Sequence, residues 1–315
     1  VVSHLEEFND FFKVLIRSKA ALLDIVVRYI LKQRGKRVRP TLVFLSAAMC
    51  GQISRRTHIA ASLVELLHTA TLVHDDVVDE ADKRRGVPSI NAVWKNKVAV
   101  LVGDYLLAKG LLIAVEHEEF DYLRITSTSV RRMSEGELLQ IQKSRQKTLD
   151  EETYFQIISD KTASLISTCC EIGAVSTSDN IEYRKALRDY GELVGIAFQI
   201  QDDILDYISR SSIVGKPTGN DIKEKKITLP LIYACQNADK SEGRAIVKSL
   251  KSGKLSNQSV DEIIRFVEKN HGITQSQEKA NSIIAEAKDK IASFPDSPAK
   301  KSLLQFADYV IKRTK

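Results

Sequence analysis

Apolar residues recur every three or four positions along almost the whole chain, which is the spacing that places them on one face of an α-helix. The run Leu63, Leu66, Leu67 and Ala70 shows this spacing, and no long segment alternates apolar and polar residues as a strand would. Glycine and proline, which interrupt helices, fall in a few clusters between the apolar runs. The pattern predicts an all-α protein with helices over 2–33, 39–50, 55–79, 90–115, 118–147, 151–176, 180–209, 226–237, 241–252, 258–270, 273–293 and 297–313.

The segments between the predicted helices contain no recognisable linker between domains. No run is polar enough, or rich enough in glycine and serine, to separate two folded parts, and no fixed-period repeat indicates a solenoid. A length of 315 residues is compatible with one large domain or two ordinary ones. We therefore predict a single domain over residues 1–315.

The formal net charge of +6 suits an anionic substrate, a nucleic acid or an acidic membrane surface equally well. The basic stretches lack interleaved aromatic residues, so we expect no nucleic acid partner. The four cysteines show no zinc-binding spacing, which predicts a reduced, cytoplasmic compartment. The most apolar stretch, 98–115, is interrupted by Asp104 and Lys109, so we expect no membrane span, which needs about 20 apolar residues.

Two acidic segments with the same D-D-x-x-D pattern each end a predicted helix, at 75–79 and at 202–206. Residues four apart on a helix project from one face, so each segment offers two stacked carboxylates. Like charges at this spacing repel by a few tenths of a kcal/mol, and the negative end of the helix dipole adds to the repulsion. A single copy of the pattern is most simply a solvated acidic helix end. Two copies inside otherwise apolar helices instead predict sites that need a cation, because carboxylates buried without a partner are costly.

Mg²⁺ is the cation that these carboxylates favour. It is a hard ion that takes one or two carboxylates, keeps several waters and completes its coordination with phosphate oxygens. Calcium is less favoured, because the sequence has no glycine-turned acidic loop of the EF-hand kind. Two such pairs facing each other would hold a diphosphate.

Cationic residues stand at the breaks between the predicted helices, where a diphosphate would need them. The segment 34–40 brings four cations to the start of a helix, whose free N–H groups also favour anions. Arginine can grip phosphate through paired donors, while lysine acts as a point charge. His68 lies seven residues before Asp75, on nearly the same helix face, and is either a ligand-binding residue or a satisfied core histidine. The further candidates are Arg84, Arg85, Lys161, Lys216 and Lys226.

Taken in order, these elements resemble the trans-isoprenyl diphosphate synthases, most closely those that make long, octaprenyl-type chains. The family's G-K-x-x-R-P element is present at 35–40, although Arg34 stands where a glycine usually precedes it. The other matching elements are the two aspartate motifs, Arg84-Arg85-Gly86, Gly136-Glu137-Leu138-Leu139-Gln140, Lys161-Thr162, Phe198-Gln199 and Gly215-Lys216-Pro217.

The resemblance implies a single orthogonal helix bundle around a deep central cavity, usually as a homodimer. It implies that three Mg²⁺ ions are held by Asp75, Asp79 and Asp202, with Asp206 as a further ligand. Isopentenyl diphosphate would bind Lys36, Arg39, His68 and Arg85. The allylic diphosphate primer would bind Arg84, Lys161, Lys216 and Lys226, with Thr162 and Gln199 close to the reacting centre.

The implied reaction is the ionisation of the allylic diphosphate, followed by attack of the isopentenyl double bond on the cation. Positions four and five before the first aspartate are Thr71 and Ala70, where short-chain members often carry bulky aromatic residues. We therefore expect a long tail to run past Ala70 and Leu67, giving about an octaprenyl product that serves as a quinone side-chain precursor. Ala70 could instead be a helix-packing residue, with the floor of the cavity near Met133. Transient membrane contact is expected for release of such a product.

Three alternatives stay open. A short-chain farnesyl or geranylgeranyl diphosphate synthase would share every motif. A class I terpene cyclase would need an aspartate-rich helix but no second diphosphate site such as Lys36 and Arg39 provide. A noncatalytic partner subunit would be expected to lose one aspartate motif, and both are intact.

Overall fold

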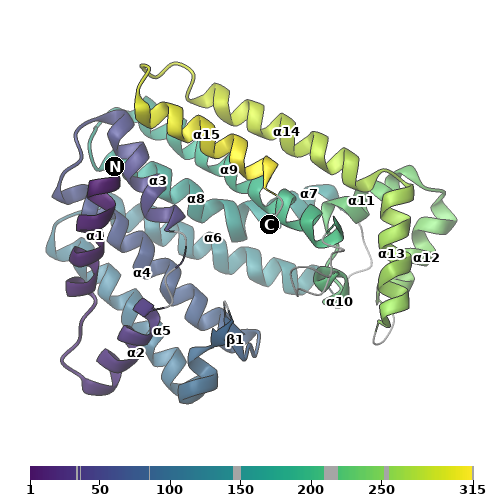
Figure 1. The fold of residues 1–315 in the computed structure, drawn as a ribbon, viewed down its shortest axis with the longest axis horizontal. Helices are drawn as coiled ribbons and strands as arrows, with labels where there is room; N and C mark the ends of the chain where they lie inside the picture. The colour runs from purple at the N-terminus through teal and green to yellow at the C-terminus, as the bar shows by residue number, and fades with distance from the viewer. Residues whose placement is uncertain are drawn as a thin grey trace. The chain divides into compact units, whose positions relative to one another are not determined.

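The structure, a computed structural model, describes residues 1–32, 35, 37–84, 86–144, 150–208, 219–251 and 255–313. Within these ranges it is almost entirely helical (Figure 1), which confirms the predicted all-α class. The helices are α1 (Val2–Leu15), α2 (Ala21–Lys32), α3 (Val38–Cys50), α4 (Arg55–Val78), α5 (Ile90–Glu116), α6 (Phe120–Ser144), α7 (Glu151–Ile158), α8 (Ser164–Val175), α9 (Ile181–Ile208), α10 (Asn220–Lys223), α11 (Leu229–Asn237), α12 (Lys240–Lys251), α13 (Asn257–Lys269), α14 (Gly272–Lys290) and α15 (Pro298–Lys312). A π-helical turn, η1 (Ser159–Ala163), joins α7 to α8, and β1 (Lys83–Arg84) pairs antiparallel with β2 (Val87–Pro88).

The predicted helix over 2–33 is wrong, because the chain breaks between α1 and α2. The Ser18 hydroxyl accepts a hydrogen bond from the Ala20 N–H, and such local side-chain bonds compete with helix formation. Arg17 lies in the break, and its Nε is 3.5 Å from a carboxylate oxygen of Asp24 in α2. Asp24 is buried and also pairs with Arg28. These ion pairs fix the turn against the start of α2.

Three short elements were not predicted. The β1–β2 hairpin pairs Lys83 with Pro88 and Arg84 with Val87, and Gly86 in its turn has a φ of +81°, which glycine adopts readily. The predicted helix over 151–176 is interrupted by η1, and α10 precedes the predicted helix that becomes α11. The parts of predictions that fall on 145–149, 209–218 or 252–254 lie outside the described residues.

The described chain clusters into two compact units. Unit 1 comprises Val1–Val130, Leu165–Arg188 and Phe294–Leu303, and unit 2 comprises Arg131–Ser164, Asp189–Ser293 and Leu304–Lys315. The boundary falls inside α6, α9 and α15, each of which contributes residues to both units. The single domain over 1–315 stays a prediction.

Unit 1 is built on α4, which packs along α5 on one side and against α3 on the other, with α1 beside α3 (Figure 1). Phe44, Leu66 and Leu106 are among its largest fully buried side chains. A Cβ at Gly173 of α8 would lie 2.4 Å from the Val43 carbonyl oxygen. Only glycine therefore allows α8 to cross α3 this closely. The packing fixes the end of α4 that carries the first acidic motif.

In unit 2, α11 packs against α12, α13 and α14, which are drawn in green to yellow-green in Figure 1. Their apolar core includes Tyr207, Leu231 and Ile263, which are fully buried. Tyr207 belongs to α9, and its hydroxyl shares a hydrogen bond with the Thr228 hydroxyl at 3.0 Å. The last turn of α9, which carries the second acidic motif, is thereby anchored in this core.

Among the described residues, α5 is the one helix that is long and apolar enough to cross a membrane by length and composition. Of its most apolar window, 39% is buried, and α5 packs along α4 as a core helix does. The charges of Asp104 and Lys109 are therefore too few to exclude α5 as a membrane span by composition alone. The absence of a membrane span stays a prediction.

Candidate active site

The first acidic motif lies at the C-terminal end of α4, in unit 1. Asp75 and Asp79 are exposed and stand one helical turn apart, as predicted, with Asp79 at the C-cap. Asp76 points away from them and is buried, with 4% of its surface exposed. The helix thus presents two carboxylates to solvent and keeps the third inside the unit.

Arg84 neutralises the buried carboxylate of this motif. Its Nε donates to the Asp76 Oδ1 at 2.7 Å, and the hairpin after α4 is what returns Arg84 to the helix end. Only the Nε–H is used in this bond, so the rest of the guanidinium fork can still donate to phosphate. Arg84, predicted to bind the allylic diphosphate, therefore stands beside the first motif.

His74 holds the same helix end against α5. Its Nε2 lies 3.2 Å from the Val100 carbonyl oxygen and 3.4 Å from a carboxylate oxygen of Asp104. A Cβ at Gly103 would lie 2.2 Å from the same Nε2, so the absent side chain leaves room for the imidazole. The orientation of the acidic end is thus set by contacts on the neighbouring helix.

Two predicted diphosphate-binding residues occupy the interior of unit 1. His68 is buried on α4, and Arg39 is half-buried in the first turn of α3. The charges of Arg39 and Glu65 act on Cys169 of α8, although burial has the largest effect and raises the pKa of that thiol well above its usual value. Arg39 is therefore close to α8.

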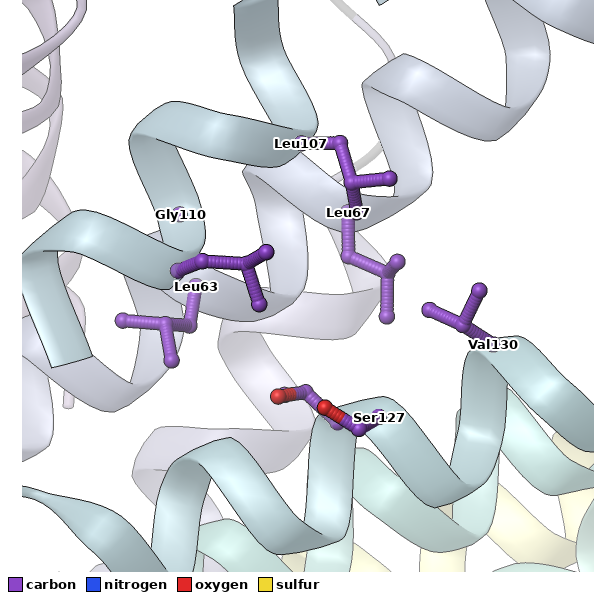
Figure 2. Close-up of a pocket in the computed structure, with 8 residues that line it drawn as sticks. Leu63, Leu67, Leu107, Gly110, Ser127 and Val130 are labelled. Atoms are coloured by element: carbon purple, nitrogen blue, oxygen red, sulfur yellow. The ribbon is translucent and has the colours of Figure 1, made fainter. Parts of the chain in front are cut away.

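A pocket opens between α4, α5 and α6 within unit 1. It encloses about 280 Å³, part of which is open to solvent, and Figure 2 shows the side chains of Leu63, Leu67, Leu107 and Val130 converging on it. The other lining residues are Gly110, Leu111, Thr126 and Ser127. Leu63 and Leu67 belong to the helix face predicted to follow a growing tail. Ala70 is buried closer to the aspartates, and Thr71 donates its hydroxyl to the His68 carbonyl oxygen at 2.9 Å.

The second acidic motif lies near the end of α9, in unit 2. The Arg313 guanidinium donates to the Asp202 Oδ1 at 2.7 Å and to the Phe198 carbonyl oxygen at 2.7 Å. It also lies over the Phe198 ring, 3.8 Å from the centroid, while the Gln201 side chain donates to the Arg313 carbonyl oxygen. The end of α15 thus supplies a positive charge to the carboxylate predicted to bind metal.

Asp206 of α9 and Lys226 both contact Asp221 of α10. The Asp206 Oδ2 accepts the Asp221 N–H at 3.0 Å, and Lys226 pairs with the carboxylates of Asp221 and Glu224 at 3.2 and 2.6 Å. Burial lowers the pKa of Lys226, but the bonds to these carboxylates outweigh it and hold the pKa above its usual range. Lys226 is therefore charged and placed close to the second motif.

Lys161 and Thr162 are carried by the π-helical turn η1. The Lys161 Nζ lies 2.5 Å from the Glu137 Oε2 and 3.4 Å from the Gln140 Oε1, both on α6. The G-E-L-L-Q element that the sequence shares with its family thus holds the Lys161 ammonium. π-Helical turns are frequent at functional sites because they re-aim side chains within a continuous helix.

Two glycines let α6 and α9 close on this turn from both sides. A Cβ at Gly136 would lie 2.9 Å from the Asp160 Cβ, and one at Gly195 would lie 2.5 Å from the Ala163 Cα. Arg132 of α6 spans the same three elements, because it donates to Asp160 at 2.7 Å, to the Ser159 hydroxyl at 2.8 Å and to both Glu192 oxygens. The π-turn is therefore clamped rather than free to relax.

Gln199 is fixed by hydrogen bonds from two elements. Its Oε1 accepts the Thr162 hydroxyl at 2.9 Å, and its Nε2 donates to the Asp203 Oδ1 at 2.8 Å. The buried Tyr154 hydroxyl donates to the other Asp203 oxygen at 2.7 Å. Burial raises the pKa of Asp203 to about 7, while the two bonds it accepts favour the carboxylate. One chain of bonds thus links α7, η1 and α9.

A model of the polyprenyl synthetase family matches residues 20–267. The chain belongs to this family. Enzymes of the polyprenyl synthetase family are prenyl transferases that use isopentenyl and allylic diphosphates and a divalent metal.

Individual relatives cover nearly the whole chain. An all-trans-nonaprenyl-diphosphate synthase (geranyl-diphosphate specific) of Rhodobacter capsulatus is 36% identical, over 99% of this chain and 96% of its own. The crystal structure of a decaprenyl diphosphate synthase from Rhodobacter capsulatus has a TM-score of 0.93 and 34% identity, over 100% of this chain and 97% of its own. That of a geranylgeranyl pyrophosphate synthase from Bacteroides thetaiotaomicron has a TM-score of 0.84 and 37% identity, over 99% and 97%.

For a polyprenyl synthetase, the predicted site residues divide between the units. Asp75, Asp79, Arg84, Arg39 and His68 belong to unit 1. Asp202, Asp206, Lys161, Thr162, Gln199, Lys226 and Met133 belong to unit 2. Arg84 contacts the first motif in unit 1, and in unit 2 Thr162 bonds to Gln199 while Asp206 and Lys226 both contact Asp221. The joining of these residues into one diphosphate clamp stays a prediction. Lys36, Arg85 and Lys216 lie outside the described residues.

Sequence reasoning missed the residues that hold the predicted ones in place. Arg132, Tyr154 and Arg313 contact residues 27 to 115 positions away in the chain, so no local pattern points to them. Arg313 stands in a basic stretch of the sequence that would be expected on the surface, yet its side chain is only 10% exposed. The one local signal was Gly136, whose place in a helix predicts a close approach of backbone.

Tyr154→Phe tests the bond chain that orients Gln199. Losing the hydroxyl leaves an Asp203 oxygen unpaired and buried, so we expect a loss of about 1–3 kcal/mol in unfolding free energy. We also expect kcat to fall about tenfold with little change in KM, because Gln199 is predicted to lie near the reacting centre. Tyr233→Phe is the matched control, since its hydroxyl donates to Glu151 away from the motif. Equal kcat values for the two variants would contradict the role given to Tyr154.

Proposed function

We propose that this enzyme condenses isopentenyl diphosphate with an allylic diphosphate to make a long all-trans polyprenyl diphosphate of about octaprenyl length, within a hexaprenyl to decaprenyl range. The observation that carries the proposal is the apolar pocket lined by Leu63 and Leu67 of α4, the helix that also carries Asp75 and the small side chain of Ala70. Such a product suits a quinone side-chain precursor made in the cytoplasm.

The distances along α4 support a path for the tail. At 1.5 Å per residue, Ala70 lies about 7.5 Å, Leu67 about 12 Å and Leu63 about 18 Å from Asp75 along the helix axis. Leu67 and Leu63 line the pocket, and neither Ala70 nor Thr71 carries an aromatic ring that would close its approach. The pocket itself is small and apolar, so it would hold only part of a long tail.

The relatives support a long chain without deciding it. Two of those described above are a nonaprenyl and a decaprenyl diphosphate synthase. The geranylgeranyl pyrophosphate synthase has a similar identity of 37%. A short-chain farnesyl or geranylgeranyl diphosphate synthase is therefore the second candidate, and product length is the measurement that separates them.

The donor set fits Mg²⁺. Asp75 and Asp79 offer exposed carboxylate oxygens on one helix face, and hard oxygen donors with room for waters are what Mg²⁺ requires. We propose three ions, held by Asp75, Asp79 and Asp202, with Asp206 as a further ligand. Bound there, Mg²⁺ would stabilise negative charge on the leaving diphosphate.

The cationic side chains complete the binding of the two diphosphates. We assign the allylic diphosphate to Arg84, Lys161, Lys216 and Lys226, and isopentenyl diphosphate to Lys36, Arg39, His68 and Arg85. Fixed cations aimed at a charge that grows during ionisation lower the barrier without reorganising. The apolar pocket walls exclude water, which would otherwise quench the allylic cation. Thr162 holds Gln199 beside the reacting carbons.

We propose a homodimer in which α5 contributes to the interface. Several of its apolar side chains face solvent in the single chain, with Leu101 59% and Leu112 49% exposed. An apolar patch of this kind on one helix is typical of a protein contact. A second copy of the chain would cover it.

The aspartate assignment predicts that Asp75→Ala and Asp202→Ala each lower kcat by several orders of magnitude, because each removes a metal ligand needed for ionisation. Turnover is measured with labelled isopentenyl diphosphate and an allylic primer, and Asp261→Ala, an exposed aspartate on α13, is the control. A variant that kept more than about a tenth of the activity would have lost less than ~1.4 kcal/mol of transition-state stabilisation. That result would contradict the assignment of Asp75 and Asp202 as metal ligands.

The separation of the two diphosphate sites predicts that Lys36→Ala or Arg39→Ala raises the KM for isopentenyl diphosphate at least about tenfold, through loss of a charge-assisted bond. The KM for the allylic primer should change little. Steady-state kinetics with each substrate varied in turn makes the comparison. Equal effects on both KM values would mean that the two sites are wrongly assigned.

The tail path predicts that Ala70→Phe shifts the product to about farnesyl or geranylgeranyl length while elongation continues, because the ring fills the approach to the pocket. Ala70 is buried, so Ser127→Phe, at an exposed position on the pocket wall, gives a second test with less risk to folding. Chromatography of the dephosphorylated products measures the lengths. Full-length products from both variants would show that the tail takes another path.

The homodimer predicts that Leu101→Glu combined with Leu112→Glu yields monomers at concentrations where the unaltered protein is dimeric, because two charges would then be buried without partners. Sedimentation equilibrium reports the mass. Val2→Glu combined with Val14→Glu, at exposed apolar positions on α1, is the control and should leave the mass unchanged. A monomeric unaltered protein would rule out the dimer.

A further inference from the structure

A cluster of metal-ligating side chains stands near the N-terminal end of α4, far along the helix from Asp75. His4 and Glu7 lie one turn apart on α1, and His58 lies in the first turn of α4. Among the described residues, these three form the group whose ligand atoms all lie within 4.8 Å of one another. Nothing in the proposed reaction uses them.

The spacing of the three ligand atoms is close to that of a tetrahedral metal site. The Glu7 Oε2 lies 3.5 Å from the His4 Nδ1 and 3.7 Å from the His58 Nε2. Bonds of about 2.1 Å to a tetrahedral ion separate neighbouring ligand atoms by about 3.4 Å. Small side-chain rotations would therefore bring all three atoms to bonding distance of one ion.

The hydrogen bond of His58 fixes which ring nitrogen can bind a metal. Its Nδ1 lies 3.1 Å from the Ser54 carbonyl oxygen, which can only accept, so the Nδ1 carries the proton. The Nε2 then presents its lone pair on the side of Glu7. A backbone carbonyl that orients a histidine in this way is the usual support for a metal-binding imidazole.

His4 adds a second, independent observation. Its Nδ1 is buried and makes no hydrogen bond with any described residue, although a third of the side chain is exposed. A buried polar nitrogen without a partner costs about 1–3 kcal/mol. The ring is held in place by stacking on Phe44, at 6.1 Å and 12°, and Phe44 also packs against His58. The fixed ring holds this Nδ1 3.5 Å from the Glu7 carboxylate, within the cluster.

We propose that His4, Glu7 and His58 bind one divalent transition-metal ion of the Zn²⁺ type, with water as the fourth ligand. Two imidazoles and a carboxylate suit such an ion, whereas Mg²⁺ prefers an all-oxygen shell. Glu7 is 64% exposed, which leaves an open side for entry and for the water. The bound ion ties α1 to α4 and so stabilises unit 1.

Co²⁺ is the probe, because it takes Zn²⁺ sites and absorbs visible light when bound by imidazole. The full chain is titrated with Co²⁺ in excess Mg²⁺, which occupies the aspartate motifs. We expect one equivalent with visible absorption, displaced by Zn²⁺, and at least about tenfold weaker binding for His4→Ala and for His58→Ala. His117→Ala is the matched control: its Nδ1 also contacts a backbone carbonyl, at 3.0 Å from Ile113, but it lies outside the cluster.

Glu7→Gln keeps the test decisive if a histidine variant fails to fold, since the change is exposed and nearly isosteric. We expect it to weaken Co²⁺ binding, and to abolish most of the rise in Tm that Zn²⁺ gives the unaltered protein. Prenyl transfer in saturating Mg²⁺ should be unchanged in Glu7→Gln, which separates this site from the active site. An unaltered protein without the absorbing equivalent, or a Glu7→Gln variant with full affinity, would overturn the proposal.

Discussion

Repulsion between carboxylates on one helix face is the constraint around which both acidic ends are built. At the end of α4 the repulsion of Asp75 and Asp79 adds to the negative end of the helix dipole. Both side chains are exposed, and the cation Arg84 is bonded to Asp76 between them in the motif. A site of this kind keeps its affinity for an incoming cation.

In both D-D-x-x-D segments, helix geometry gives the middle aspartate a different environment from the first and last ones. The middle aspartate is turned by 100° from its predecessor, so it points into the protein when the flanking ones face out. Asp76 is buried on Arg84, and Asp203 is buried on Tyr154 and Gln199. In each segment the interior carboxylate anchors the local structure. Asp75 and Asp79 are exposed at the end of α4, whereas Asp202 pairs with Arg313 and Asp206 accepts the Asp221 N–H.

The sequence predicts helix bounds well where the spacing of apolar residues alone determines them. Helices predicted over 39–50, 55–79 and 90–115 differ from the observed α3, α4 and α5 by one residue at an end. The break between α1 and α2 depends on the Ser18 hydroxyl, and an apolar pattern does not register it. The π-turn escaped prediction for a related reason, since apolar spacing continues on both sides of one extra residue.

The chemical types of the candidate site residues could be predicted from the sequence, but the residues that hold them in place could not. Paired aspartates and clustered cations are local patterns, and they single out Asp75, Asp202 and Lys161 as candidates from the sequence alone. Their partners are joined only by folding. Arg313 reaches Asp202 across 111 positions, and Arg132 reaches Glu192 across 60. Neither pair has a spacing that could be read from the chain.

The π-turn makes the geometry of the adjoining helices depend on the number of residues in this one segment. Because η1 holds one residue more than an α-helical turn, deleting a residue there would restore the regular helix and rotate everything before it by about 100° relative to α8. Lys161 would leave Glu137, and Arg132 would lose Asp160. Substitutions within 159–163 can be absorbed one side chain at a time, but an insertion or deletion cannot. Variation in chain length among functional sequences should therefore be absorbed in the loops and be absent from this turn.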